Sequence, residues 1–111
     1  MTTASSDTPV LDTLAAMTLD SLEHCGLDAK TLIFTRIAAL AAMDAPAISY
    51  LANLGPASDV GMTAEELQDV LVAVAPIVGT ARVMAAAGHI AQALGIAIAV
   101  AETGMASGNG A

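Results

Sequence analysis

Apolar side chains recur every three or four residues along most of this chain, which is the spacing of one face of an α-helix. Capping residues, prolines and glycines divide the pattern into separate segments. Helices are predicted near residues 9–23, 29–43, 45–54, 63–78 and 80–102. We therefore expect an all-α fold, a compact bundle of about five helices.

Several helix ends carry specific signals. Asp28 is the expected N-cap of the second helix, and Asp44 that of the third, with Pro46 in its first turn. Gly55-Pro56 is expected to stop the third helix and to open a loop that reaches residue 62. The fourth helix begins at the capping box Thr63-Ala64-Glu65-Glu66.

The two ends of the chain differ from the middle in composition. Residues 1–8 are polar and predict a disordered arm without the features of a signal peptide. Residues 104–111 are rich in Gly, Ser and Asn and predict a flexible tail. A single helical domain is expected over residues 9–103.

The apolar content is too high for a small isolated domain. Apolar residues other than glycine make up 56% of the 111 residues, with one Phe, one Tyr and no Trp. Typical soluble domains reach about 45–50% with glycine included. A domain of this size buries only about two thirds of its unfolded surface. We therefore expect an obligate homo-oligomer.

Charge and cysteine content limit the partners. The net charge of −8, with three basic residues, leaves almost no cations for nucleic acid or anionic lipid. Cys25 is the only cysteine, so no disulfide framework is possible and the cytoplasm is the expected location. Residues 83–101 carry no Asp, Glu, Lys or Arg and approach the length of a membrane span. Gly88, His89 and Gln92 favour instead a helix buried among subunits, so no membrane partner is expected.

Four segments in the middle of the chain share a pattern with a known family. They are Leu27-Asp28-Ala29-Lys30-Thr31, the Ala-rich helix that ends at Met43, the run from Gly61 to Leu67, and the run from Ala75 to Arg82. In their order and spacing, residues 27–95 resemble the carboxymuconolactone decarboxylase family, which includes the alkylhydroperoxidase D-like proteins. The resemblance implies an all-α fold that assembles as a homotrimer or homohexamer.

The redox motif of that family is absent. Its redox members carry two cysteines, a histidine and an upstream glutamate. In the two possible registers, the cysteine and histidine positions fall on Met43, Pro46 and Tyr50, or on Ala45, Ile48 and Ala52. The glutamate position falls at residues 31–33, which include no carboxylate. Without a thiolate nucleophile, dithiol peroxidase activity is not expected, and no cofactor is expected either.

Three side chains remain as candidates for a site. Tyr50 is the only ionisable residue between the acidic residues Asp44 and Asp59, and a phenol is an acid that stays protonated near neutral pH. Arg82 and His89 are seven residues apart, on one face of the last helix, where they would hold a small acidic molecule. The alternatives are a packed aromatic for Tyr50 and a structural hydrogen bond at a subunit interface for His89.

Glu23-His24-Cys25 places a carboxylate, an imidazole and a thiol in sequence, but neighbouring residues on a helix point about 100° apart. A polar helix end with a half-buried thiol is the expected structure. The two histidines have no carboxylates at ligand spacing, so no metal site is expected.

Three functions follow from these observations. The first is an oligomeric homologue without the dithiol, which binds a small acidic or apolar ligand in a closed pocket lined by Tyr50, Arg82 and His89, or is inert. The second is a lyase or oxidoreductase acting on a small lactone, keto acid or peroxide, with Tyr50 or His89 as the acid or base. The third is a structural assembly subunit.

Overall fold

A computed structural model describes the backbone of residues 7–108 and the side chains of residues 7–99. This part of the chain forms five helices and no strand, so the predicted all-α class is confirmed. The helices are α1 (Pro9–His24), α2 (Ala29–Ala42), α3 (Ala47–Asp59), α4 (Ala64–Val78) and α5 (Thr80–Gly108). Residues 1–6 of the predicted arm and residues 109–111 of the predicted tail lie outside the described residues.

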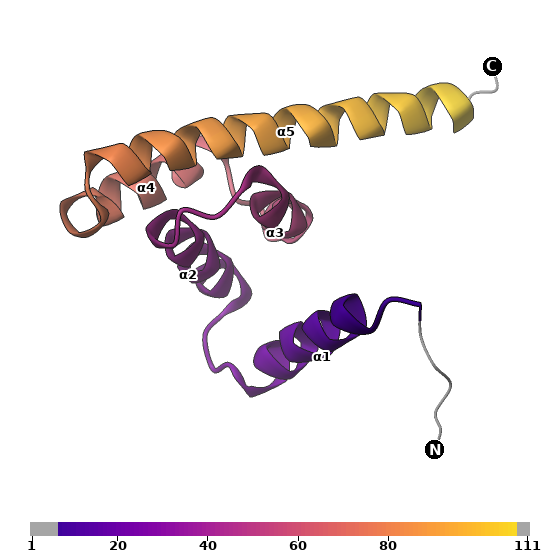
Figure 1. Cartoon of the computed structure of the whole chain (residues 1–111), viewed down its shortest axis with the longest axis horizontal. Coiled ribbons are helices and arrows are strands. Elements are labelled where there is room, and N and C mark those ends of the chain that lie inside the picture. Colours follow the sequence, from indigo (N-terminus) through magenta and orange to yellow (C-terminus); the bar gives the residue numbers. More distant parts are fainter. Residues whose placement is uncertain (1–6, 109–111) are drawn as a thin grey trace.

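Helices α2 to α5 pack together around one core, with α5 lying across the other three (Figure 1). Ile37 and Tyr50 are the largest side chains that are fully buried. The rest of the core is small or branched and comes from all four helices and the turn before α3: Leu32, Ile33, Ala41, Ala45, Ala47, Leu54, Ala57, Leu67, Val70, Leu71, Ala86, Ile90 and Ala93. Small side chains let the helices approach one another closely.

The turn between α2 and α3 differs from the prediction. Asp44 adopts a left-handed conformation with φ of 55°. The Ala45 N–H donates to the Leu40 carbonyl at 3.0 Å, and the Asp44 N–H donates to the Ala41 carbonyl at 3.2 Å. This pair of bonds is a Schellman motif, so Asp44 ends α2 and does not cap α3. Pro46 is itself the residue before α3 and not part of its first turn.

Helix α3 is longer than predicted. It continues through Gly55 and Pro56 to Asp59, and Gly61, with φ of 76°, follows its end. Tyr50, Leu54 and Ala57 lie at helical spacing and are all buried, so packing favours continuation. Pro56 has no N–H for the Ala52 carbonyl, but both residues are exposed, which leaves that carbonyl accessible to water. The predicted loop at residues 55–62 is therefore wrong over its first half.

The predicted start signals of α2 and α4 are confirmed. The Asp28 side chain accepts a hydrogen bond from the Thr31 N–H at 2.9 Å. In the capping box, the Glu66 N–H donates to Thr63 Oγ1 at 3.1 Å and the Thr63 N–H donates to Glu66 Oε1 at 3.0 Å. Lys30 Nζ lies 2.9 Å from Glu66 Oε2, so an ion pair joins the starts of the two helices.

Helix α5 starts after Gly79, whose φ of 94° suits only glycine, and runs to Gly108. The backbone of residues 104–108 is therefore helical where a flexible tail was predicted. The segment Thr80–Ala99 is long and apolar enough to cross a membrane, and only 17% of it is buried within this chain. Buried core helices pass the same test of length and composition, but this helix buries one face only.

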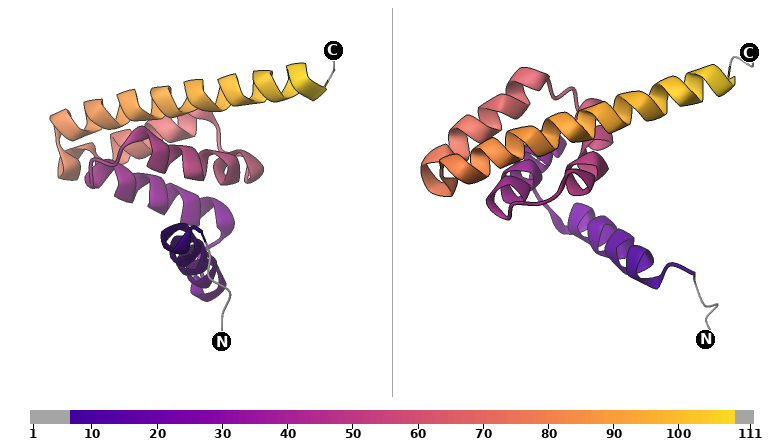
Figure 2. Two further views of the ribbon diagram at one scale, coloured as in Figure 1. Left: turned by 45° about the vertical axis from the view of Figure 1, so that its right-hand side comes forward. Right: turned by 45° about the horizontal axis from the view of Figure 1, so that its top comes forward.

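Helix α1 lies outside the bundle in Figure 1, although it overlaps the edge of α2 in the left view of Figure 2. One hydrogen bond, from Arg36 Nη2 to Ser21 Oγ at 3.2 Å, joins it to α2. Helix α1 packs closely against none of the other four helices and has no buried residue. A four-residue segment, 25–28, joins it to α2. The sequence pattern predicted the bounds of α1 correctly but not its separation from the bundle.

Candidate functional site

The contact between Tyr50 on α3 and His89 on α5 brings two of the three predicted site residues together. Their ring centroids are 6.5 Å apart, and the rings are tilted by 32°. Tyr50 is 0% exposed, and His89 is half-buried. Tyr50, Leu54 and Ala57 are all buried, so Tyr50 lies on the inner face of α3. His89 precedes Ile90 and lies beside the buried stripe of α5, which consists of Ala86, Ile90 and Ala93.

Two polar atoms at this contact have no hydrogen-bond partner among residues 7–99. They are the Tyr50 hydroxyl and His89 Nδ1, and no other buried side-chain nitrogen or oxygen in the described region shares this property. A buried polar group without a partner costs about 1–3 kcal/mol. The pair therefore forms a position where a ligand group or a water molecule that accepts or donates hydrogen bonds would be stabilised.

The surroundings of Tyr50 keep its hydroxyl protonated. Burial raises the pKa of the Tyr50 phenol above its ordinary value of 10.0, and the negative charge of Asp44 raises it further. At neutral pH the side chain is therefore a neutral hydrogen-bond donor or a weak acid, and it carries no negative charge.

Arg82 does not join this pair. Its side chain is exposed, and its guanidinium donates to the Ala42 carbonyl at the end of α2. A cation at that position satisfies a free carbonyl and interacts favourably with the helix dipole. None of the four cavities described for residues 7–99 is lined by Tyr50, Arg82 or His89. None of these four cavities is therefore the predicted closed pocket lined by all three residues.

Two of these four cavities are open grooves elsewhere on the surface. One, of about 430 Å³, lies between α2 and α4, with Phe34 and Val70 among its apolar lining residues and Glu66 and Asp69 as its carboxylates. The other, of about 510 Å³, lies between α1 and the α2–α3 pair. Periodicity along the chain did not indicate either groove, because each is made by the relative placement of two or three helices.

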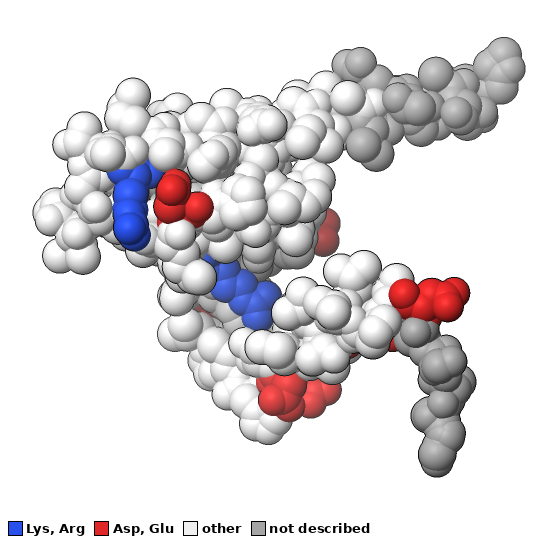
Figure 3. Space-filling model, in the orientation of Figure 1, with Lys and Arg blue, Asp and Glu red and all other residues white. Residues whose placement is uncertain are grey.

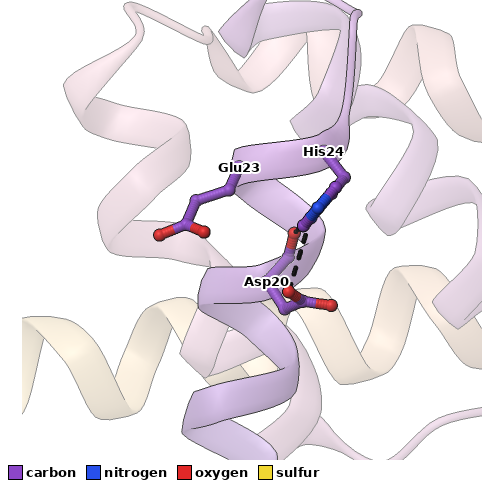
Figure 4. Close-up of side chains that lie close together, drawn as sticks. All are labelled: Asp20, Glu23 and His24. Atoms are coloured by element: carbon purple, nitrogen blue, oxygen red, sulfur yellow. Dashed lines mark hydrogen bonds and ion pairs between the residues drawn. The ribbon is translucent and has the colours of Figure 1, made fainter.

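The end of α1 carries a small cluster of titratable side chains (Figure 4). Asp20, Glu23 and His24 are all exposed, and their potential ligand atoms lie within 4.8 Å of one another. His24 Nδ1 lies 2.8 Å from the Asp20 carbonyl and 3.4 Å from Asp20 Oδ1. The prediction that neither histidine has carboxylates at ligand spacing is therefore wrong for His24. It overlooked Asp20, four residues earlier on the same helix face.

Cys25 follows His24 in the sequence, but its side chain lies in different surroundings from this cluster. It is a free thiol, half-buried against the core, while the His24 side chain is 76% exposed. The structure thus has the polar helix end and the half-buried thiol that the sequence predicted. It shows no contact that would activate Cys25 as a nucleophile in the described part of the chain.

No family model, curated protein sequence or solved structure matches this chain.

Proposed function

We propose that this chain is a cytoplasmic, self-associating helical protein that binds a small molecule at the contact between Tyr50 and His89. The resemblance to the carboxymuconolactone decarboxylase family supports a homotrimer or homohexamer without dithiol chemistry. The observation that carries the binding proposal is that these two neighbouring rings each have a buried polar atom without a partner among the described residues. A ligand with a carboxylate, carbonyl or hydroxyl group on an otherwise apolar frame would satisfy both atoms.

The test is native mass spectrometry of the full chain purified without detergent. Wild type is expected to carry a retained small molecule, and Tyr50→Phe is expected to lose it, because phenylalanine keeps the packing but removes the hydroxyl. Leu54→Met is the matched control, since Leu54 is buried one turn further along α3 and the change conserves volume. Retention of the same mass by Tyr50→Phe would contradict the proposed position.

A second candidate is acid–base catalysis by the same pair. The raised pKa of Tyr50 keeps a protonated phenol beside an imidazole, as a lyase or oxidoreductase acting on a small lactone, keto acid or peroxide would require. Turnover of such a compound should then fall in Tyr50→Phe or His89→Ala while the oligomer stays intact. Full activity in both variants would leave catalysis without support.

If wild type carries no retained mass and turns over none of these compounds, the third function remains, a structural assembly subunit. In that case Tyr50→Phe should stabilise the fold, because it removes a buried hydroxyl that has no partner. A gain of about 1 kcal/mol in the free energy of unfolding would identify this outcome.

A further inference from the structure

The groove between α1 and the α2–α3 pair has a mainly apolar lining with one charge in it. Its volume is about 510 Å³, within the range of small-molecule pockets, about 300–1,000 Å³. The large apolar side chains of the lining include Leu14 and Met17 from α1 and Leu40 from α2, and Arg36 is its only charged residue. The groove therefore has the size and the chemical character of a site for a small, mainly apolar molecule.

The three basic residues of the chain have different surroundings. Lys30 forms an ion pair with a carboxylate of α4, and the Arg82 guanidinium donates to a carbonyl at the end of α2. Arg36 is half-buried, and residues 7–99 give it one hydrogen bond, from Nη2 to Ser21 Oγ at 3.2 Å, and no ion pair. Because a guanidinium has five N–H donors, Arg36 presents donors and a positive charge to the groove.

The hydrogen bond between Arg36 and Ser21 fixes where the positive charge lies in the groove. Figure 3 shows basic side-chain atoms between the bundle and α1, with mainly uncharged surface around them. From Ser21 the α1 wall of the groove continues through Met17 to Leu14, about 10 Å along the helix axis at 1.5 Å per residue. The groove thus joins one cation to an elongated apolar wall.

This arrangement fits a carboxylate that carries an unbranched apolar chain. A carboxylate accepts two parallel hydrogen bonds from a guanidinium, and the Ser21 hydroxyl has its own proton to donate. The chain would then lie along Met17 and Leu14, whose side chains are 61% and 50% exposed. Covering them removes apolar surface from water. An uncharged or cationic head group would leave the charge of Arg36 unpaired.

We infer that this groove binds the anion of a free, linear fatty acid, with the carboxylate on Arg36 and the chain between α1 and the α2–α3 pair. The bound chain contacts both walls, so it gives α1 the apolar contact that this helix lacks within the chain. The net charge of −8 repels anions from most of the surface, so binding is confined to the groove that holds Arg36. Neither Tyr50 nor His89 lines this groove, and the inference goes beyond the proposed function.

The first test compares decanoate with decanol by calorimetric titration of the full chain, below the concentration at which decanoate forms micelles. Wild type is expected to bind decanoate at least about tenfold more tightly, because hydrogen bonds to charged groups are stronger than those between neutral groups. Arg36→Met keeps an unbranched side chain but removes the guanidinium, so it should lose this preference. Arg82→Met is the matched control, since it makes the same change in net charge outside the groove and should keep the preference. Equal affinities of wild type for the two compounds would overturn the anionic ligand.

The second test locates the chain of the ligand. The protein contains no tryptophan, so a single introduced indole reports on its own surroundings. Met17→Trp places the indole on the groove wall, and Met84→Trp places it at a similarly exposed position on α5, outside the groove. Decanoate with bromine on its last carbon should quench the fluorescence of Met17→Trp and leave that of Met84→Trp unchanged. Equal quenching in both variants would overturn the assigned groove.

The outcomes separate this inference from the proposed function. Tyr50→Phe should bind decanoate as wild type does, and Arg36→Met should keep any small molecule retained at the Tyr50–His89 contact. Loss of decanoate binding in Tyr50→Phe but not in Arg36→Met would overturn this inference and assign the acid to that contact instead. No decanoate binding by wild type, from dilute to fully associated protein, would also overturn it and would leave a second copy as the occupant to test next.

Discussion

At the scale of single residues, Tyr50 shows how far sequence reasoning reaches. Its position as the only ionisable side chain between Asp44 and Asp59 made it a candidate. Its complete burial and its unpartnered hydroxyl depend on α5, which is 30 residues away at Thr80 and beyond. Arg82 was a candidate by spacing from His89, but the carbonyl of Ala42 lies within its reach and engages it. Spacing predicts which residues share a face, and only packing decides which polar atoms meet.

Burial of Tyr50 predicts a loss of stability at alkaline pH. The unfolded phenol ionises near 10, and burial raises the pKa in the folded state, so the folded chain binds more protons in that window. The contribution is fully present below pH 10 and is lost as pH rises toward the folded pKa. Tyr50→Phe should remove this slope. Urea unfolding of both proteins at a series of alkaline pH values measures it, and identical slopes would contradict the burial-linked shift.

The capping box predicts a second residue-scale effect. Thr63→Ala removes the oxygen that accepts from the Glu66 N–H and should lower the free energy of unfolding by about 1 kcal/mol. Thr13→Ala is the control, since the hydroxyl of Thr13 donates to the Pro9 carbonyl on the exposed helix α1. Its effect should stay within about 0.5 kcal/mol. Equal effects from both changes in chemical denaturation would contradict a specific role for the cap.

At the scale of elements, the errors in the prediction cluster around α3. The local signals at Asp44 and Pro46 predicted that this helix begins before Ala47, its true first residue. The signal at Gly55-Pro56 predicted that it ends before Asp59, its true last residue. The buried face of Tyr50, Leu54 and Ala57 carries the helix past the proline. Helix starts with strong side-chain caps, at Asp28 and Thr63, were predicted correctly because those caps act within one turn.

The two prolines of this region predict opposite effects on stability. Pro56 is inside α3, so Pro56→Ala restores a backbone donor and should raise the free energy of unfolding by about 1–3 kcal/mol. Pro46 precedes the helix with φ of −73°, which suits proline, so Pro46→Ala should lower it by about 0.4–1 kcal/mol. Both changes are measured by urea unfolding at one protein concentration. A loss of stability in Pro56→Ala would show that Pro56 contributes more by packing than it costs in hydrogen bonding.

At the scale of the whole molecule, charge and apolar surface oppose each other in association. Each chain carries a net charge of −8, while α1 and much of α5 expose apolar side chains. Repulsion between copies is screened by salt, and apolar contact is not weakened by it. Raising the salt concentration from about 10 mM to about 150 mM should therefore tighten self-association. Sedimentation at both concentrations tests this, and salt-induced dissociation would indicate an interface held mainly by ion pairs.

The sequence by itself determined the helical class, the number of helices, and the ends at which a side chain caps its own turn. It also determined that apolar surface exceeds what one small chain can bury, because that follows from composition and length. These properties are local or compositional, so they can be derived without knowing which helices meet.

Only the tertiary structure decided that α1 stands apart, that α3 passes through Pro56, and that Tyr50 and His89 meet with unpartnered polar atoms while Arg82 does not join them. Each of these depends on contacts between residues distant in the chain. The free energy gained from these contacts exceeds the local conformational preference of a proline or a turn residue. Helical periodicity in the sequence contains no information on which helix each face will contact.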